Sequence, residues 1–286
     1  ERIVEGKAMH ELEVLPKIVG GVGPKSTEMA SDFMSIFGGD VIAVSNSRTA
    51  EMCKLIDNSY RMTRFGFSAD IAAVSWRNGI NAFEAIRASN HNYDRNNVPL
   101  PSIGVSGYCL TKDPYYLDVG GTEIWKERGF LSTWISARKA ADFQTQEAVE
   151  RVMDHFSGFE GAVRIVIAGA TYKENIDDSR FSHGRILAKE LAKMGCEILF
   201  WDPMSEDGKI EGFEVKRDYG CIAGNDCIIF TVPHSEYVEW ANSMPGIDSM
   251  RTKVIFDGWG IVENVPEGVF LFGTGVPKTM GTSSKG

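Results

Sequence analysis

The stretch AVRIVIAGATYKENIDDSRFSHGRILAKELAKMGCEILFWDP, residues 162–203, decides the fold of this sequence. It opens with a short apolar run and continues through a polar loop into a segment with apolar residues at helical spacing. It closes on a second short apolar run. Strand, helix and strand in this order form the unit from which parallel sheets are built. We therefore expect a parallel sheet with helices on both faces, and thus an α/β protein.

The same pattern continues along the chain, in DCIIFTVPH (226–234) and KVIFDGWG (253–260). Residues 46–157 differ, because long stretches of them have apolar residues at helical spacing. The sequence thus predicts a helical central domain at 46–157 and a Rossmann-like parallel-sheet domain at 158–286. Residues 1–45 are too few for a domain of their own. The tail GTGVPKTMGTSSKG (273–286) is expected to be poorly ordered.

The loop IAGATYKENIDDSR, residues 167–180, tests whether this sheet binds a redox dinucleotide. Asp202 ends a strand about one strand-helix-strand unit after Gly169, as a ribose-binding acid would. The loop has a single glycine, however, where the dinucleotide turn G-x-G-x-x-G needs three. It offers Lys173 and Arg180 instead, at the edge of the sheet where ligands bind. A nucleotide diphosphate other than the redox cofactor is the ligand that this pattern favours.

Composition excludes several classes of function. The chain has 286 residues, a formal net charge of −9 and 43% hydrophobic residues. The acidic balance argues against nucleic acid as a partner. No apolar run is long enough to span a membrane, and the first residues have no apolar signal core, so a cytoplasmic protein without a membrane partner is expected. The five cysteines lack the spacing of a metal site or a disulfide framework.

The segment SGYCLTKDP, residues 106–114, raises the question of a reactive thiol. A cysteine becomes a nucleophile near a helix N-terminus or a cation, and Lys112 and the flanking glycine suit such a site. Alternatively, Cys109 is a small buried residue and Asp113 caps a helix that begins at Pro114. This fragment alone leaves both interpretations open.

Other candidate residues are ambiguous when taken one at a time. Lys54 and Asn58 are four apart in a predicted helix and share one face, where they could donate to an oxyanion or simply face solvent. His183 and His234 lie near predicted strand ends without a matching nucleophile, so a structural role is favoured for both.

Four segments together resemble motifs of the UDP-glucose/GDP-mannose dehydrogenase family. ERIVEGKA (1–8) is similar to the segment S-P-E-R-x-x-E-G-x-A that closes the family's NAD-binding domain. AEMCKLIDNSY (50–60) is similar to its central helix A-E-x-x-K-x-x-x-N. PSIGVSGYCLTKDP (101–114) is similar to its catalytic loop, and IAGATYKENIDDSR to its nucleotide-sugar loop. Four motifs in one order make a specific resemblance over nearly the whole chain.

The resemblance implies an NAD-dependent, four-electron oxidation of a nucleotide sugar's C6 alcohol to a carboxylate, by way of a thiohemiacetal and a thioester on Cys109. Lys54 and Asn58 would stabilise the oxyanion. The residues implied to be catalytic are Cys109, Lys54, Asn58, Asp113 and the general acid/base Glu1. The implied cofactor contacts are Glu5, Lys112 and Arg180, and the implied substrate contacts are Lys173, Tyr172, Arg95, Gly104 and Trp259. A homodimer through the central helices is implied as well, with Arg95 reaching across it.

The sequence departs from the family pattern in three places. No G-x-G-x-x-G precedes the central domain, so residues 1–45 are interpreted as the remnant of an NAD-binding domain that is otherwise missing, and the chain alone is expected to hold NAD poorly. Ser106 replaces a glycine before the cysteine, and Trp259 stands where the family usually has an arginine. GYCLTKDPYYL is somewhat closer to members that act on UDP-N-acetylhexosamines.

Two alternatives remain open at this point. The chain could be a non-catalytic module that dimerises and binds a nucleotide sugar. It could also belong to a related dehydrogenase that makes a single hydride transfer and has no need of the cysteine.

Overall fold

The computed structural model describes residues 3, 6–119 and 121–282. The chain divides into two compact units. The first unit comprises residues 1–61 and 112–135, and the second comprises residues 62–111 and 136–286. The predicted domain boundaries at 45 and 157 stay a prediction.

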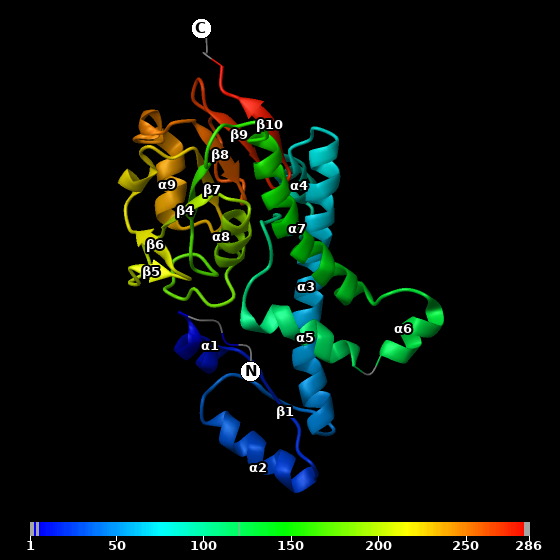
Figure 1. Cartoon of the computed structure of the whole chain (residues 1–286). Helices are drawn as coiled ribbons and strands as arrows, with labels where there is room; N and C mark the ends of the chain where they lie inside the picture. The colour runs from blue at the N-terminus through cyan, green and yellow to red at the C-terminus, as the bar shows by residue number, and fades with distance from the viewer. Residues whose placement is uncertain (1–2, 4–5, 120, 283–286) are drawn as a thin grey trace. The chain divides into compact units, whose positions relative to one another are not determined.

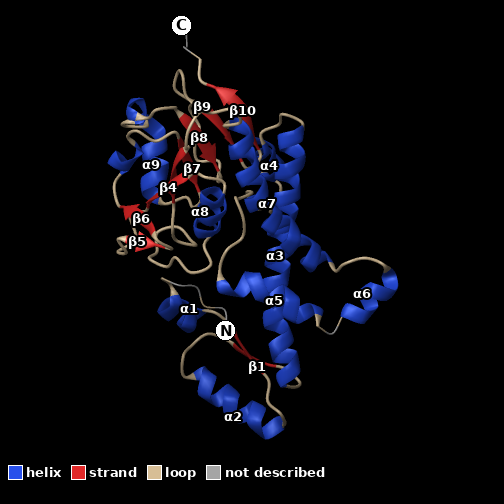
Figure 2. Ribbon diagram, in the orientation of Figure 1, coloured by secondary structure: helices blue, strands red, loops and turns tan. Residues whose placement is uncertain are grey.

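The first unit contains a small parallel pair of strands joined by a helix (Figure 2). Strand β1 (Lys17–Val19) lies beside β2 (Val41–Ala43), and α2 (Pro24–Ser35) connects them. Pro24 begins α2, where its fixed φ fits the helix and its missing N–H is no loss. The other helical segments of this unit are α1 (Ala8–Val14), the start of α3 (Ser47–Arg77), most of α5 (Tyr108–Asp118) and α6 (Thr122–Arg128).

The second unit is built on a mixed sheet with the strand order β10-β9-β8-β7-β3-β4-β6-β5 (Figure 1). Its centre is parallel, as predicted, and the antiparallel pairs β9/β10 and β5/β6 lie at its two edges. The strands are β3 (Arg164–Ala168), β4 (Glu197–Trp201), β5 (Lys209–Ile210), β6 (Phe213–Lys216), β7 (Cys227–Phe230), β8 (Val254–Asp257), β9 (Phe270–Gly273) and β10 (Val276–Met280).

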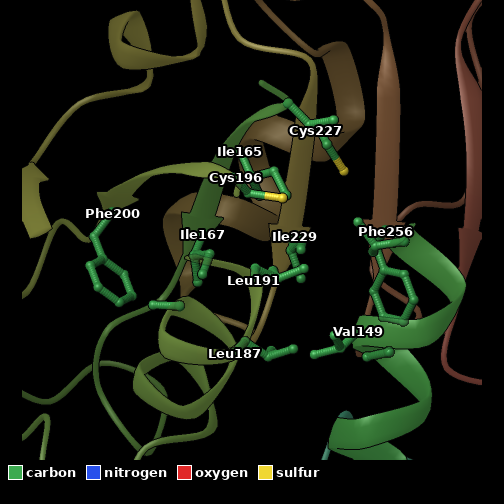
Figure 3. Packing of buried hydrophobic residues seen from close by; sticks show 14 of the residues in the cluster. Val149, Ile165, Ile167, Leu187, Leu191, Cys196, Phe200, Cys227, Ile229 and Phe256 are labelled. Atoms are coloured by element: carbon green, nitrogen blue, oxygen red, sulfur yellow. The ribbon is translucent and has the colours of Figure 1, made fainter. Parts of the chain in front are cut away.

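Helices cover both faces of this sheet. The helical segments of the unit include α4 (Ala82–Asn90), α7 (Thr133–His155), α8 (His183–Lys193), α9 (Ser235–Ser243), η1 (Tyr219–Ile222) and η2 (Ile247–Ser249). Strand β3 divides its side chains between two cores, since successive residues of a strand point to opposite faces. Ile165 and Ile167 pack with α7 and α8, as Figure 3 shows, whereas Val166 and Ala168 pack with α9. Each fully buried isoleucine contributes about 1.5–3 kcal/mol.

Two sequence expectations are wrong at the level of secondary structure. The tail is not without order throughout, because residues 276–280 form the edge strand β10 against β9. Pro277 is tolerated there since an edge strand leaves one row of amides unpaired. Helix α5 begins at Tyr108 and contains Pro114, so Asp113 does not cap a helix that starts at Pro114.

Candidate functional site

The carboxyl ends of four parallel strands meet at one edge of the second unit's sheet. Ala168 is paired with both Trp201 and Phe230, and Phe230 is paired with Asp257. The loops that follow therefore begin side by side, at the edge where open α/β sheets bind their ligands. One of them is residues 171–182. We call it the nucleotide-sugar loop, after the family motif that residues 167–180 resemble.

Asp202 binds the backbone at the start of this loop. Its carboxylate accepts hydrogen bonds from the amides of Ala170 (2.7 Å) and Thr171 (3.1 Å) through one oxygen. The other oxygen accepts from Met204 (2.9 Å) and Ser205 (3.1 Å). Asp202 is fully buried and its acceptor sites are occupied by backbone, so it acts as a clamp and does not face a ribose.

His234 fixes the middle of the loop. Its Nδ1 accepts from the Asn175 amide at 2.8 Å, so the ring proton resides on Nε2, which lies 3.0 Å from Thr171 Oγ1 and 3.6 Å from Asp202 Oδ2. Burial alone would raise the pKa of Asp202, but the adjacent His234 ring and hydrogen bonds from backbone amides outweigh it and hold this pKa below its ordinary value. Tyr172 and Lys173 stand between these anchors. Sequence reasoning missed this clamp, although an aspartate directly after a strand was a signal for it.

The end of the nucleotide-sugar loop presents Arg180. Its guanidinium pairs with the Asp178 carboxylate at 2.6 Å, and this hydrogen bond holds the pKa of Asp178 below its ordinary range. The Arg180 side chain keeps 72% of its surface exposed. Asn175 (φ 57°) and Phe181 (φ 56°) adopt left-handed backbone conformations that non-glycine residues rarely take. Residues with such backbone conformations cluster at functional sites, where the surrounding structure holds them in place.

Trp259 follows β8 at the same edge. Its indole Nε1 donates to the Thr231 carbonyl at 2.7 Å, and its amide donates to the Asp257 carboxylate at 3.0 Å. The ring orientation is therefore fixed from two sides. A half-buried indole held in this way offers a flat apolar surface and no cation.

Cys109 lies in the first turn of α5, at the end of residues 101–109, which we call the cysteine loop. Gly107 has φ 94°, a conformation that glycine alone adopts readily, and its carbonyl accepts from the Thr111 amide as the helix begins. All five cysteines are described, and only Cys109 is exposed. By contrast, burial raises the pKa of the Cys221 thiol to about 12. The interpretation of Cys109 as a buried residue is wrong.

Gly104 is buried within the cysteine loop, against the ring of His183. A Cβ added at this position would lie 2.4 Å from His183 Cε1. Both histidines that the sequence left as structural are buried and hydrogen-bonded, His183 to Thr145 and His234 as above.

We expect Gly104→Ala to lower the free energy of unfolding by about 1–3 kcal/mol, because the added methyl group has no room beside the imidazole. Gly208→Ala is the matched control, since nothing lies within 4 Å of a Cβ built there. Urea denaturation of both variants measures the difference. Equal unfolding midpoints for the two variants would contradict the close packing of Gly104.

Asn58, Asp113 and Lys112 come together in the first unit. Asn58 is buried and its Nδ2 donates to Asp113 Oδ2 at 2.5 Å, while Lys112 Nζ donates to Oδ1 at 2.5 Å. The alternative of a solvated polar face is therefore wrong for Asn58. Its neighbour Lys54 lines the same pocket of about 340 Å³ as Asn58. An amide and an ammonium that line one pocket can donate hydrogen bonds to an oxyanion.

The remaining predicted residues are placed as follows. Glu1 and Glu5 lie outside the described residues. Arg95 is exposed, with its guanidinium 4.7 Å from the ring centroid of Tyr93. Within the described ranges, no group of three or more His, Cys, Asp or Glu side chains is arranged to hold a metal ion. The helices described there include none with the length and apolar character that a membrane span requires.

Known proteins resemble this chain in sequence and in fold. UDP-N-acetyl-D-mannosamine dehydrogenase of Methanococcus maripaludis is 29% identical over 270 residues, which cover 92% of this chain and 60% of that protein. The structure of UDP-D-ManNAc dehydrogenase from Pyrococcus horikoshii matches with a TM-score of 0.82 and 27% identity, over 96% of this chain and 63% of that one. The Staphylococcus aureus UDP-N-acetyl-mannosamine dehydrogenase gives a TM-score of 0.79 and 26% identity, over the same shares. The chain thus spans about 60% of the length of these relatives.

Two family models match the parts that carry the predicted motifs. Residues 48–137, with Lys54, Asn58 and Cys109, match the central domain of the UDP-glucose/GDP-mannose dehydrogenase family. Residues 166–264, with the nucleotide-sugar loop, match the UDP binding domain of the same family. Because both matches name one family and follow its domain order, the chain belongs to the UDP-glucose/GDP-mannose dehydrogenase family.

Proposed function

We propose that this chain is the part of a nucleotide-sugar 6-dehydrogenase that binds the UDP-sugar and carries the catalytic thiol. The observation that carries the proposal is Cys109, the one exposed thiol, at the start of a helix in a chain that belongs to this family. The reaction is the four-electron oxidation of a C6 alcohol to a carboxylate, with two NAD as the electron acceptors.

The intermediates of the proposed reaction are bound covalently to the sulfur of Cys109. The C6 alcohol loses a hydride and a proton to give an aldehyde. The Cys109 thiolate adds to its carbonyl carbon, and the oxyanion that forms takes up a proton to give a thiohemiacetal. Loss of a second hydride and a proton leaves a thioester. Water attacks the thioester, the C–S bond breaks, and the uronic acid and the free thiol are released. Lys54 and Asn58 stabilise the oxyanion, Asp113 positions the water, and Glu1 is the general acid/base.

NAD supplies the hydride acceptor in this scheme. Glu5, Lys112 and Arg180 are the proposed contacts of the chain with it. The side chains of Lys112 and Arg180 keep 34% and 72% of their surface exposed, so each is accessible to an anionic group.

The proposed substrate is a UDP-N-acetylhexosamine. Relatives at 29% identity are named UDP-N-acetyl-D-mannosamine dehydrogenase. Lys173 and Tyr172 on the nucleotide-sugar loop, with Gly104, would contact the nucleotide sugar. The fixed indole of Trp259 would stack on a ring where the family's arginine would donate hydrogen bonds.

A homodimer is the proposed assembly. Met52, Ile56 and Tyr60 recur every four residues on α3, and each is exposed. A stripe of this spacing on a helix is the pattern by which two helices pack together. Arg95, which is exposed, would reach the partner's substrate.

Binding of UDP to the chain tests the proposal without NAD. Titration calorimetry should show UDP bound by the wild-type chain, and Lys173→Ala should weaken it by at least about tenfold through loss of a charged contact. Lys193→Ala is the control, because Lys193 lies in the last turn of α8, paired with Glu190. If UDP at millimolar concentration gives no heat, or if both variants bind as the wild type does, the proposed nucleotide site is wrong.

A further inference from the structure

The cysteine loop contacts the nucleotide-sugar loop at two points within the second unit, and a third contact joins it to His183, the residue that follows that loop. Gly104 lies against the ring of His183. At Gly107, a Cβ would be 3.4 Å from the ring of Tyr172. The rings of Tyr108 and Phe181 are 5.7 Å apart between centroids. The segment that ends in Cys109 is therefore packed along the loop assigned to the nucleotide sugar.

A series of buried hydrogen bonds fixes the contact between Gly104 and His183. Thr145 Oγ1 on α7 donates to the Ile103 carbonyl at 2.9 Å and lies 2.7 Å from His183 Nδ1. The Thr145 hydroxyl thus links the Ile103 carbonyl to the imidazole of His183. Burial lowers the pKa of His183 to about 4, although the Val105 backbone opposes this shift, and the ring is therefore neutral near pH 7.

Arg138 holds the cysteine loop from the same helix. It is 1% exposed, donates to the Val105 carbonyl at 2.9 Å, and pairs with Asp142 at 2.5 Å. The backbone on both sides of Gly104 is thus bonded to buried side chains of α7. Such networks are rigid, because every alternative arrangement leaves a buried polar group unpaired.

His183 is at once a member of this network and the first residue of α8, directly after the nucleotide-sugar loop. We propose that Thr145 and His183 are positioning residues that couple the two loops, so that a nucleotide bound at residues 171–182 changes the reactivity of Cys109. The functional part of this inference rests on the proposed function. The coupling is reciprocal by thermodynamic necessity, so the state of the cysteine loop also changes the affinity for the nucleotide.

Thr145→Val tests the coupling, since valine has the shape of threonine without the hydroxyl. The hydrogen bonds described for the Thr145 side chain go to Ile103 and His183, which are not proposed catalytic residues. Thr145→Ser restores the hydroxyl. Thr252→Val is the matched control, because Thr252 Oγ1 donates to the Asp226 carbonyl at 2.7 Å, next to the first residue of β7 and away from both loops. Thermal unfolding should show comparable losses of stability in the two valine variants.

The first readout is amide hydrogen exchange in the unliganded chain. Thr145→Val should speed exchange about threefold to tenfold in residues 102–110 and also in 171–182, to which Thr145 is linked by its hydrogen bond with His183. Thr145→Ser and Thr252→Val should leave both segments near the wild-type rates. A response confined to residues 102–110, or an equal response in Thr252→Val, would overturn the coupling.

The second readout is the alkylation rate of Cys109 by iodoacetamide, located by mass spectrometry, with and without saturating UDP. UDP should slow the alkylation of Cys109 by about threefold or more in the wild type, Thr145→Ser and Thr252→Val. In Thr145→Val the slowing factor should be less than about half of the wild-type factor. Equal UDP effects in all four proteins would refute the functional coupling. If calorimetry shows that UDP does not bind, the proposed function fails, while hydrogen exchange still decides whether the loops are coupled.

Discussion

Cys109→Ser should lower kcat by at least about 10³-fold in the protein that carries this chain, assayed with NAD and a UDP-N-acetylhexosamine. A serine hydroxyl is far less ionised than a thiol at neutral pH, and an ester is a poorer intermediate for hydrolysis than a thioester. The fall should be in kcat, with KM for the sugar nucleotide changed little, since in the proposed mechanism Cys109 acts on the aldehyde formed after binding. Steady-state NADH formation at 340 nm provides the measurement.

Cys221→Ser is the matched control for this variant. Burial raises the pKa of the Cys221 thiol to about 12, so it remains protonated and unreactive near pH 7. Its replacement should leave kcat within about twofold of the wild type. A Cys109→Ser enzyme that keeps the wild-type rate would remove the covalent mechanism and favour a single hydride transfer.

The number of NADH formed for each sugar also distinguishes the four-electron scheme from a single hydride transfer. The four-electron scheme gives two NADH for each sugar oxidised, whereas a single hydride transfer gives one. Glu1→Gln should slow hydrolysis enough for the thioester on Cys109 to be detected by mass spectrometry. A chain that binds UDP but forms no NADH in any form of the protein would instead be a binding module.

Asp202→Ala should destabilise the protein by about 3–5 kcal/mol, which is a large part of the total stability of an ordinary domain. The substitution leaves four backbone amides, those of residues 170, 171, 204 and 205, without their acceptor in a fully buried position. Urea denaturation measures the loss. Asp207→Ala, an exposed change in the neighbouring loop, should cost less than about 0.5 kcal/mol.

The pH dependence of stability gives a second test of Asp202. Its pKa in the folded state is lowered, so its stabilising effect is fully present above the unfolded pKa of about 3.9 and is lost as the pH falls through the folded pKa. The wild type should therefore lose stability below about pH 4. Asp202→Asn should be less stable near neutral pH and flatter in this acid range. If the stability of the wild type and of Asp202→Asn fell equally with pH, the Asp202 carboxylate would not be the group that causes the loss of stability in acid.

The sequence predicted those parts of the fold that depend on local pattern. Short apolar runs such as 164–168 and 197–201 are strands, and their parallel pairing follows from the helix between them. The exposure of Cys109 was not predictable from its own segment, where a glycine and a proline suited two different helix starts. The resemblance to a family predicts the reactive role of Cys109 that the local residues left open.

Other features depend on contacts distant in sequence and could not be predicted. Asn58 and Asp113 are 55 residues apart, and only the fold shows that the amide meets the carboxylate in a buried position. Asp202 looked like a ribose-binding acid, because its place after a strand is the same whether it faces a ligand or the backbone. Edge strand β10 was missed since Pro277 and the surrounding glycines resemble a loop, and its partner β9 supplies the order.

The division of β3 between two cores also determines which changes of chain length the second unit tolerates. Deleting one residue from 164–168 would move Gly169 by about 3.3 Å and exchange the faces of the side chains on one side of the deletion. The amides of residues 170 and 171 would then no longer lie within hydrogen-bond distance of the Asp202 carboxylate. Insertions and deletions should therefore accumulate in exposed segments such as 206–209, which leave the spacing between the sheet and the nucleotide-sugar loop unchanged.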